Sequence, residues 1–449
     1  MQAAKIAETK PESVAFRSRI IRDPLHDLIR VDDREILEVM HAPAFQRLRQ
    51  IRQLGLAFLV YPGAEHSRFI HALGAYHLAN RMIESLKRQN STLFTDTELL
   101  AIPLAALCHD IGHGPFSHLF ERVTKDFVGD GANHETWTVR ILEEQQDISK
   151  ILEEAGVKQT ITEIINHTYE KLHVQDIISS QLDVDRFDYL CRDSLMTGVK
   201  YGDLDLSWLL RTVKVAETLV GGQTRSVLAL DARRGMSSVE SYILGRHHMY
   251  KHVYYHKTIR SAETMLKKLL TEVVKATGNK KLKDSLTHPV FVSLANKEVP
   301  SLYDYLAIND FVILNLLEQW AKCGIEPVAD LAMRLRNRDI FAAIVVSDKL
   351  IGDIQKSHDA IEKTKNFLKE KKLDPDIYYI YDTPQDTAYK DLYYYQRKEK
   401  EDEAQDLYCV DGDKVFTLSS RKTFLSELEY IEHRVYVPKE FEKEIRSFW

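Results

Sequence analysis

A long apolar run that ends abruptly in a cluster of histidines constrains this chain most. Residues 99–107 read Leu-Leu-Ala-Ile-Pro-Leu-Ala-Ala-Leu, a pattern that predicts a buried helix. His109 and Asp110 follow at once, His113 and His118 come shortly after, and two glycines and a proline stop the helix. Unpaired polar groups at the end of a core helix would be costly. The pattern therefore predicts the floor of a metal-binding cavity, with hydrogen-bonded core histidines as the alternative.

Composition sets only broad limits on the rest of the chain. Its 449 residues suffice for about two or three domains, or for one large core with an appended lobe. The net charge of −6 argues against a protein whose whole surface binds nucleic acid, although a local basic pocket is compatible with it. The cysteines are scattered without a Cys-x-x-Cys pair, which favours a reducing compartment over a disulfide framework.

No apolar run approaches the roughly 20 residues that span a bilayer, and the polar first residues contain no signal peptide. We therefore expect a soluble cytoplasmic protein with no membrane partner.

Element patterns predict a mainly α fold with small β-hairpins. Residues 1–18 are predicted to be a flexible tail, 19–284 a helical core and 285–449 a C-terminal α+β lobe. Hairpins are expected near 20–31 and 211–231. Helices are expected from about 34 and 68, and over 45–54, 133–144, 159–170, 236–276, 301–307, 309–323, 327–335 and 351–373. Strands are expected at 377–381, 408–410, 415–418 and 434–437, and a solvated loop at 397–403.

A basic segment stands out early in the chain. Within the helix predicted over 45–54, Arg47, Arg49 and Arg52 lie off the apolar stripe, and Gly55 is expected to end the helix. This pattern is typical of a solvated basic face, and it also suits contact with an anion or a nucleotide.

Four residues are candidates for one metal site: His71, His109, Asp110 and Asp185. Two imidazoles and two carboxylates suit a divalent ion such as Mn, Fe, Zn, Ni or Co. Such an ion acidifies water and polarises phosphate oxygens. The donor set therefore predicts hydrolysis of a phosphate ester or anhydride.

Further histidines accompany these ligands. His113, His118 and His134 can exchange a proton near neutral pH. Asn133 is expected to cap the helix that His134 begins. Glu121 follows His118 by three residues, so a continuing helix would let it orient that imidazole.

A second polar face is predicted downstream. Asp185, Tyr189 and Asp193 are spaced i, i+4 and i+8, so they share one face of a helix and suit a pocket wall. The helix over 236–276 is rich in His and Tyr. Composition leaves open whether it forms a mixed surface or a wall facing a polar ligand.

In order and spacing, these segments resemble the HD-domain superfamily, and within it the deoxynucleoside triphosphate triphosphohydrolases. The likeness is greatest to bacterial enzymes and to the HD core of the vertebrate enzyme that joins a SAM domain to an HD domain, and it covers roughly residues 19–260. It is carried by Arg22–His26, Phe45–Gly55, Pro62–Gly74, Leu107–His118, Asn133–Glu135 and Asp183–Asp193.

The resemblance implies that a dNTP is split at the α-phosphorus into a deoxynucleoside and tripolyphosphate, with Mg bound to the nucleotide. It implies that the four candidate ligands hold the metal, that His118 and His134 are catalytic, and that His113 is a further site histidine. The implied substrate residues are Arg68, Arg186 and Arg246 for the phosphates, Gln53 and Leu54 beside the sugar, and Tyr189, Asp193 and Tyr254 in the wall that reads the deoxyribose.

The family also binds activator nucleotides between the subunits of a tetramer. Gln46 and Arg49 match part of that site, and Arg338 is a candidate for another part. His41 stands where the vertebrate enzyme has an aspartate that recognises guanine, so a strict guanine activator is not expected. No SAM domain is expected before the core.

Two alternatives remain open. One is an HD phosphohydrolase acting on another nucleotide or on nucleic-acid ends, although Ile111-Gly112-His113-Gly114 replaces the Glu-Asp signature of alarmone and cyclic-nucleotide hydrolases. The other is a nucleotide-gated protein that binds single-stranded nucleic acid weakly. The basic segment favours it, whereas intact metal ligands are unnecessary for binding alone.

Overall fold

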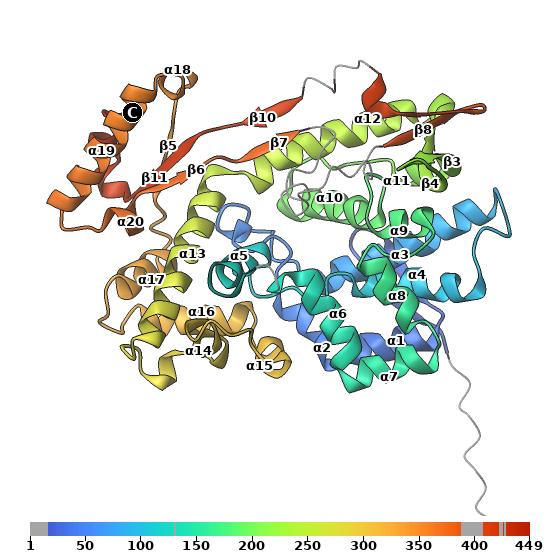
Figure 1. Ribbon diagram of the computed structural model, residues 1–449, viewed down its shortest axis with the longest axis horizontal. Helices are drawn as coiled ribbons and strands as arrows, with labels where there is room; N and C mark the ends of the chain where they lie inside the picture. The colour runs from blue at the N-terminus through green and yellow to red at the C-terminus, as the bar shows by residue number, and fades with distance from the viewer. Residues whose placement is uncertain (1–16, 130–131, 388–406, 422–424, 426–427) are drawn as a thin grey trace, which may run out of the picture.

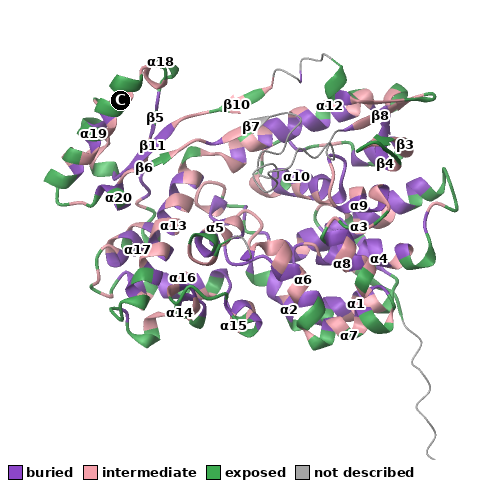
Figure 2. Cartoon of the chain, in the orientation of Figure 1, coloured by how far each residue is buried: buried purple, intermediate pink, exposed green. Residues whose placement is uncertain are grey.

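Helices α3 (Arg68–Lys87) and α4 (Asp96–Cys108) pack side by side, and most of their residues are buried (Figure 2). The computed structural model describes residues 17–129, 132–387, 407–421, 425 and 428–449. The fold is mainly helical with small sheets, as the sequence predicts (Figure 1). Most of the predicted tail and the predicted loop at 397–403 lie outside the described residues.

The predicted buried helix is α4, and local chemistry fixes both of its ends. At the start, the Thr95 hydroxyl accepts a hydrogen bond from the Glu98 N–H at 3.2 Å, and the Glu98 carboxylate accepts one from the Thr95 N–H at 2.8 Å. Past the other end, Gly112 passes so close to the next layer that a Cβ there would lie 2.6 Å from the Thr138 hydroxyl oxygen. The glycine therefore lets the turn pass beneath the helix that carries Thr138.

The remaining helices of the first half surround this pair. Asn133 caps α6 as predicted, because its side chain accepts a hydrogen bond from the Thr136 N–H at 2.7 Å. These helices are α1 (Arg34–His41), α2 (Pro43–Gln46), α5 (His118–Val128), α6 (His134–Glu144), α7 (Gln146–Glu154), α8 (Lys158–Ile165), α9 (Leu172–Ile178), α10 (Val184–Thr197) and α11 (Leu206–Thr212).

Three predicted helices are shorter than expected or interrupted. The helix predicted over 45–54 consists of α2 and a 3-10 turn, η1 (Arg47–Gln50), because Ile51 is extended and Arg52 forms a β-bridge to Ser67. The helix predicted over 159–170 ends at Ile165, since His167 adopts a positive φ of 57°. The helix predicted over 236–276 is broken by a π-helical turn. It comprises α12 (Ala232–Met249), η4 (Tyr250–Tyr254) and α13 (Lys257–Gly278).

Both predicted hairpins form. Strands β1 (Arg19–Asp23) and β2 (Asp27–Val31) pair antiparallel, as do β3 (Val213–Val220) and β4 (Gln223–Asp231). Gly221 and Gly222 supply the two positive φ angles that the second turn requires. Strands β8 (Tyr408–Asp411) and β9 (Lys414–Thr417) extend this hairpin into a four-stranded sheet. This sheet therefore combines two strands from the predicted core (19–284) with two from the predicted C-terminal lobe (285–449).

The rest of the C-terminal part combines helices with two small sheets, which form a long ribbon above α13 in Figure 1. The strand predicted at 377–381 begins late, because Asp374 and Pro375 start a short helix. The helices are α14 (Pro289–Ala295), α15 (Leu302–Ala307), α16 (Asp310–Trp320), α17 (Val328–Arg336), α18 (Asp348–Ile351), α19 (Ile354–Glu370), α20 (Pro375–Tyr378) and α22 (Glu442–Arg446). The strands are β5 (Ala342–Val345), β6 (Ile380–Asp382), β7 (Gln385–Thr387), β10 (Glu429–Ile431) and β11 (Arg434–Val437). Among the described residues, no helix has the length and apolar character of a membrane span.

Candidate active site

The four predicted metal ligands come together from three helices. His71 lies on α3, His109 and Asp110 follow α4, and Asp185 lies in the first turn of α10. The Nε2 atoms of His71 and His109 are 3.4 Å apart. The Asp185 Oδ1 atom lies 3.0 Å from the first and 3.5 Å from the second. Asp110 completes the group, with its oxygens 3.6 Å from His71 Nε2 and 3.4 Å from His109 Nε2.

The ring orientations suit a metal ion. His109 directs Nδ1 to the Ala106 carbonyl at 2.8 Å, and His71 directs Nδ1 to the Asp188 carboxylate at 2.9 Å. An imidazole that donates from Nδ1 presents an Nε2 lone pair on its other side. Both lone pairs then face Asp185. The ligand atoms of His71, His109 and Asp185 lie within 4.8 Å of one another, so these three residues could hold a divalent ion, and Asp110 lies beside them.

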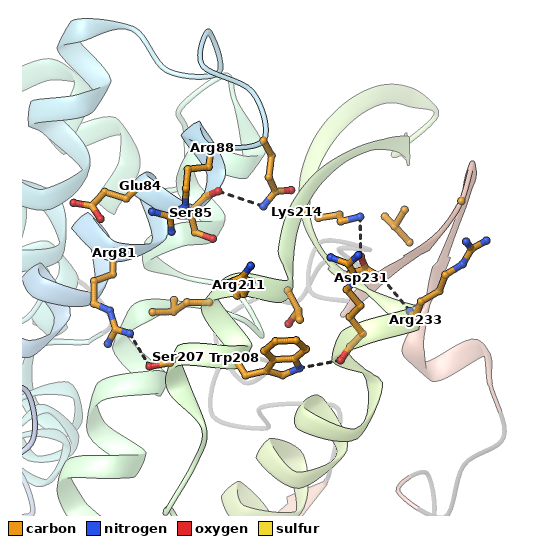
Figure 3. A pocket seen from close by; sticks show the side chains of 16 residues that line it. Arg81, Glu84, Ser85, Arg88, Ser207, Trp208, Arg211, Lys214, Asp231 and Arg233 are labelled. Atoms are coloured by element: carbon orange, nitrogen blue, oxygen red, sulfur yellow. Dashed lines mark hydrogen bonds and ion pairs between the residues drawn. The ribbon is translucent and has the colours of Figure 1, made fainter.

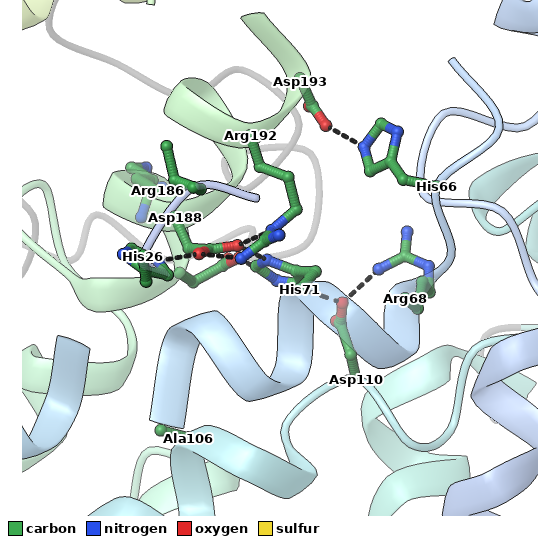
Figure 4. A network of polar contacts seen from close by, with 12 residues as sticks. His26, His66, Arg68, His71, Ala106, Asp110, Arg186, Asp188, Arg192 and Asp193 are labelled. Carbon is green, nitrogen blue, oxygen red and sulfur yellow. Dashed lines mark hydrogen bonds and ion pairs between the residues drawn. The ribbon is translucent and has the colours of Figure 1, made fainter. Parts of the chain in front are cut away.

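A buried ionic network supports this group from behind (Figure 4). Asp188 accepts from His26 Nε2 at 2.7 Å, from His71 Nδ1, and from Arg192 Nε at 2.8 Å and Nη2 at 2.9 Å. Arg192 also pairs with Asp23 at 2.8 Å. Desolvation opposes ionisation, but these partners outweigh it and hold the pKa of Asp188 well below its usual range. No role was predicted from the sequence for Asp23, His26, Asp188 or Arg192, although the i, i+4 spacing of Asp188 and Arg192 was a signal of an ion pair.

The remaining predicted histidines form a second cluster beside the first. Glu121 Oε2 lies 3.3 Å from His118 Nδ1 and 3.0 Å from His134 Nδ1. His113 and His134 stack with ring centroids 4.1 Å apart and an interplanar angle of 11°. An ion bound by both rings would have to lie in both ring planes, and nearly parallel planes do not meet there. This stack therefore disfavours a second metal ion, even though the three histidines lie close together.

Charge in this second cluster resides on Glu121. Burial opposes ionisation of Glu121, but hydrogen bonds from His118 and His134 outweigh it and lower the pKa of that carboxyl. Burial lowers the pKa of both His118 and His113, which favours their neutral forms. A carboxylate that accepts from two imidazoles is suited to fixing the orientation of both rings during proton exchange.

The predicted phosphate contacts are buried arginines near the metal ligands. Arg68 forms an ion pair with Asp110 and donates from Nε to the Ser117 hydroxyl at 2.8 Å. Arg186 pairs with Asp183. The Arg246 guanidinium lies over the Tyr250 ring, 4.8 Å from its centroid.

The residues predicted to line the sugar wall lie close together. Tyr254 donates to Asp193 Oδ2 at 2.9 Å, and its ring meets that of Tyr189 edge-on at 6.2 Å. The other Asp193 oxygen lies 2.7 Å from His66 Nε2. The backbone N–H of Gln53 donates to the His66 carbonyl at 3.0 Å, so Gln53 and the adjacent half-buried Leu54 adjoin the same wall.

The basic segment divides into structural and exposed residues. Arg47 is buried and donates to backbone carbonyls, so neither alternative from the sequence, a solvated face or an anion contact, holds for this arginine. Arg52 pairs with Glu65 at 2.6 Å. Arg49 is exposed and donates to the Gln46 side chain at 2.8 Å, whereas Arg338 donates to the Leu59 carbonyl. The structure therefore brings Gln46 and Arg49 together, while Arg338 contacts another segment.

A cavity of about 880 Å³ opens elsewhere, between α3, α11 and the β3–β4 hairpin (Figure 3). Lys214 in this cavity pairs with Asp231 at 2.8 Å, and the other cations on its wall outnumber the acids. The cationic lining residues are Arg81, Arg88, Arg211, Lys214, Arg233 and Arg234. None of the site residues predicted from the sequence lines it.

Comparison with known proteins identifies two matched regions. The family model described as HD domain matches residues 68–193, and that described as HD associated region matches 205–301. The uncharacterized protein YwfO of Bacillus subtilis is 31% identical over 440 residues, which cover 96% of this chain and 94% of that protein. The deoxynucleoside triphosphate triphosphohydrolase SAMHD1 homolog of Dictyostelium discoideum is 29% identical over 375 residues, covering 79% of this chain and 66% of the relative. A crystal structure of a phosphohydrolase from Bacteroides thetaiotaomicron shares the fold, with a TM-score of 0.76 and 24% identity over 94% of this chain and all of that one.

Proposed function

Because this chain belongs to the HD-domain family of phosphohydrolases, we propose that it hydrolyses deoxynucleoside triphosphates to a deoxynucleoside and tripolyphosphate. One observation carries the proposal: the candidate metal ligands adjoin both a cluster of three histidines and a wall that contains Tyr189 and Tyr254. The stated activity of the Dictyostelium discoideum relative supports the choice of substrate.

The proposed metal ligands are His71, His109, Asp110 and Asp185. A divalent ion held there supplies a Lewis acid for a phosphate oxygen and lowers the pKa of bound water. The ligand chemistry is compatible with Mn, Fe, Zn, Ni or Co, and we propose that Mg accompanies the nucleotide. Asp188 would support the metal site by holding His71 in the orientation that presents Nε2 to the ion.

The chain's own acid–base groups would then handle the protons. In cleavage at the α-phosphorus, a water oxygen bonds to phosphorus while the bond to the 5′ oxygen breaks, so the water loses one proton and the 5′ oxygen of the deoxynucleoside gains one. We assign that exchange to His118 and His134, with His113 packed against them. Glu121 accepts from Nδ1 of both catalytic rings, which directs Nε2 of each away from the carboxylate.

Buried arginines would bind the triphosphate. Arg68, Arg186 and Arg246 each offer a charged fork that suits phosphate oxygens. Burial makes such charge pairing stronger than it is at an exposed surface.

The sugar wall accounts for a preference for deoxy substrates. Burial raises the pKa of Tyr254 well above its usual value, so its hydroxyl remains a donor to Asp193. Tyr189 packs edge-on against it. A 2′-hydroxyl placed against this closed pair would meet packed rings and a carboxylate that already has two partners.

Product analysis tests the proposal. Purified protein is incubated with each dNTP and each ribonucleotide in Mn and in Mg, and phosphorus NMR identifies the products. We expect tripolyphosphate from dNTPs, and we expect H109A and D110A to abolish it. The control is H358A, which changes an exposed histidine on α19. Absence of tripolyphosphate with every dNTP, or full activity of the two variants, would contradict the proposal.

We also propose that this chain forms a tetramer and that bound nucleotides activate its hydrolysis of dNTPs. Gln46 and Arg49 form one exposed polar pair, and the basic cavity of Figure 3 offers a concentration of cations suited to a triphosphate. Nucleotides supplied in pairs should give higher rates than either alone, and R211E should remove that stimulation. Light scattering with and without nucleotide measures the oligomer, and rates that are additive in every pair would exclude activation.

A further inference from the structure

The turn between α4 and α5 is held by side chains from distant parts of the chain. The Tyr305 hydroxyl, on α15, donates to the Gly112 carbonyl at 2.7 Å. Arg47 Nη1, on η1, donates to the His113 carbonyl at 2.8 Å. Tyr305 is 3% exposed and Arg47 is 6% exposed, so water does not compete for these carbonyls.

A third side chain binds the strained end of the same turn. Phe116 and Ser117 have φ angles of 52° and 56°, in the left-handed region that residues other than glycine rarely adopt. Asp310 Oδ1, on α16, accepts from the Phe116 N–H at 2.8 Å. Such strain persists only where the surrounding structure over-determines the backbone. His118 follows directly as the first residue of α5.

The three side chains are themselves fixed. Arg47 Nη2 also donates to the Ile308 carbonyl at 2.9 Å, and Asp310 Oδ2 accepts from the Arg52 N–H at 2.9 Å. The Tyr305 ring stacks on Trp137, with centroids 3.7 Å apart and an interplanar angle of 5°. These contacts leave the three groups little freedom to follow the turn if it moved.

We propose that Arg47, Tyr305 and Asp310 form a turn clamp, a set of positioning residues that hold the strained turn. The clamp fixes where the rings of His113 and His118 lie, and it thereby sets the geometry of proton exchange. The inference rests on the proposed hydrolysis for its catalytic consequence. Tyr305 and Asp310 lie beyond residue 301, where the second matched region ends.

Two small substitutions test the clamp. Y305F removes only the hydroxyl that binds Gly112 and keeps the stacked ring. D310N replaces one of the two acceptor oxygens with a donor. The matched control is Y378F, which removes a hydroxyl that donates to Asp330 at 2.8 Å in the C-terminal part, away from the turn.

Both clamp variants should lower kcat by about 10- to 100-fold, because a displacement near 1 Å has that effect on a reacting geometry. Their KM values should stay within about threefold of the wild-type value, since neither substitution removes an arginine or a residue of the sugar wall. Y378F should leave kcat within about threefold of wild type, even if it loses a similar amount of stability.

Hydrogen–deuterium exchange of the peptide that spans residues 112–117 supplies a readout independent of activity. In both clamp variants, the amide hydrogens of this peptide should exchange at least about tenfold faster than in wild type, which corresponds to about 1.4 kcal/mol of lost protection. In Y378F, their exchange rate should be unchanged. If D310N fails to fold, Y305F decides the question.

Unchanged exchange in Y305F, or a kcat within about threefold of wild type in an active enzyme, would overturn the clamp. Failure of the wild-type protein to release tripolyphosphate would overturn the proposed function instead, and the exchange measurement would still decide whether the clamp holds the turn.

Discussion

Replacement of Gly74 by alanine is the sharpest test of the network behind the metal ligands. Gly74 lies inside α3, where alanine is ordinarily favoured over glycine by roughly 0.5–1 kcal/mol. A Cβ at this position would overlap the Asp188 carboxylate, with Oδ1 as the nearest atom, and would lie 2.5 Å from Arg192 Nη2. The carboxylate therefore has to move.

The expected loss in the free energy of unfolding follows from the hydrogen bonds that Asp188 Oδ1 accepts. It accepts from His26 Nε2 and from Arg192 Nη2. Each buried hydrogen bond to a charged group contributes about 1.5–3 kcal/mol, so losing both costs about 3–6 kcal/mol. Subtracting the gain in helix propensity leaves a net loss of about 2–5 kcal/mol in the free energy of unfolding.

A second effect concerns the metal. The other Asp188 oxygen orients His71, and loss of such a supporting contact typically lowers metal affinity by about 10- to 100-fold. Urea denaturation measures the stability, and metal analysis after dialysis measures the affinity. The control is G352A, where the added Cβ meets only ordinary contacts of 3.5 Å or more. If G74A were as stable as wild type and retained its metal, the argument that this glycine makes room for Asp188 would be refuted.

Removal of the metal by a chelator should lower the free energy of unfolding by about 2.7 kcal/mol when the free metal had been at 100 times its Kd, and re-addition should restore it; an unchanged urea midpoint would exclude a tightly held ion. Burial raises the pKa of Asp310 to about 6, above its unfolded value, so the wild type should gain up to about 3 kcal/mol relative to D310N as the pH falls from 7 to 4; a pH-independent difference in urea denaturation would contradict this. Y254F should weaken the preference for dNTPs over ribonucleotides by about tenfold in kcat/KM, because the Asp193 carboxylate loses its donor; equal preference in variant and wild type would exclude that role.

Much of this arrangement could be predicted because residue type and spacing carry it. The apolar run before His109 predicts a buried helix, and α4 is buried. Asn133 predicts a helix start, and its side chain does cap α6. The convergence of His71, His109 and Asp185 also follows from the motif order, and their ligand atoms lie within 4.8 Å of one another.

The features that were missed depend on tertiary contacts. Nothing local in residues 45–54 marks Ile51 as extended. That conformation lets Arg52 form its β-bridge to Ser67 and bind Asp310, which is far along the chain. The sequence leaves Arg47 either on a solvated face or in contact with an anion, because it cannot show that the carbonyls of His113 and Ile308 satisfy its charge. The π-helical turn within the helix predicted over 236–276 likewise has no local glycine or proline to signal it.

The charges of the metal ligands and of the ionic network behind them explain why a divalent cation suits this site. Four buried or half-buried carboxylates meet there, and two guanidiniums, those of Arg68 and Arg192, face them. The carboxylates are those of Asp23, Asp110, Asp185 and Asp188. Two negative charges are therefore left without a guanidinium. Burial disfavours a charged imidazole, yet hydrogen bonds to Asp185 and Asp188 raise the pKa of His71 to about 10, so the protein field at its Nε2 favours positive charge. A divalent ion satisfies that field while both Nε2 lone pairs remain unprotonated. The substitution D188N lowers the excess of carboxylates over guanidiniums from two to one. It should therefore weaken the binding of a divalent ion even where the hydrogen bond to His71 is kept.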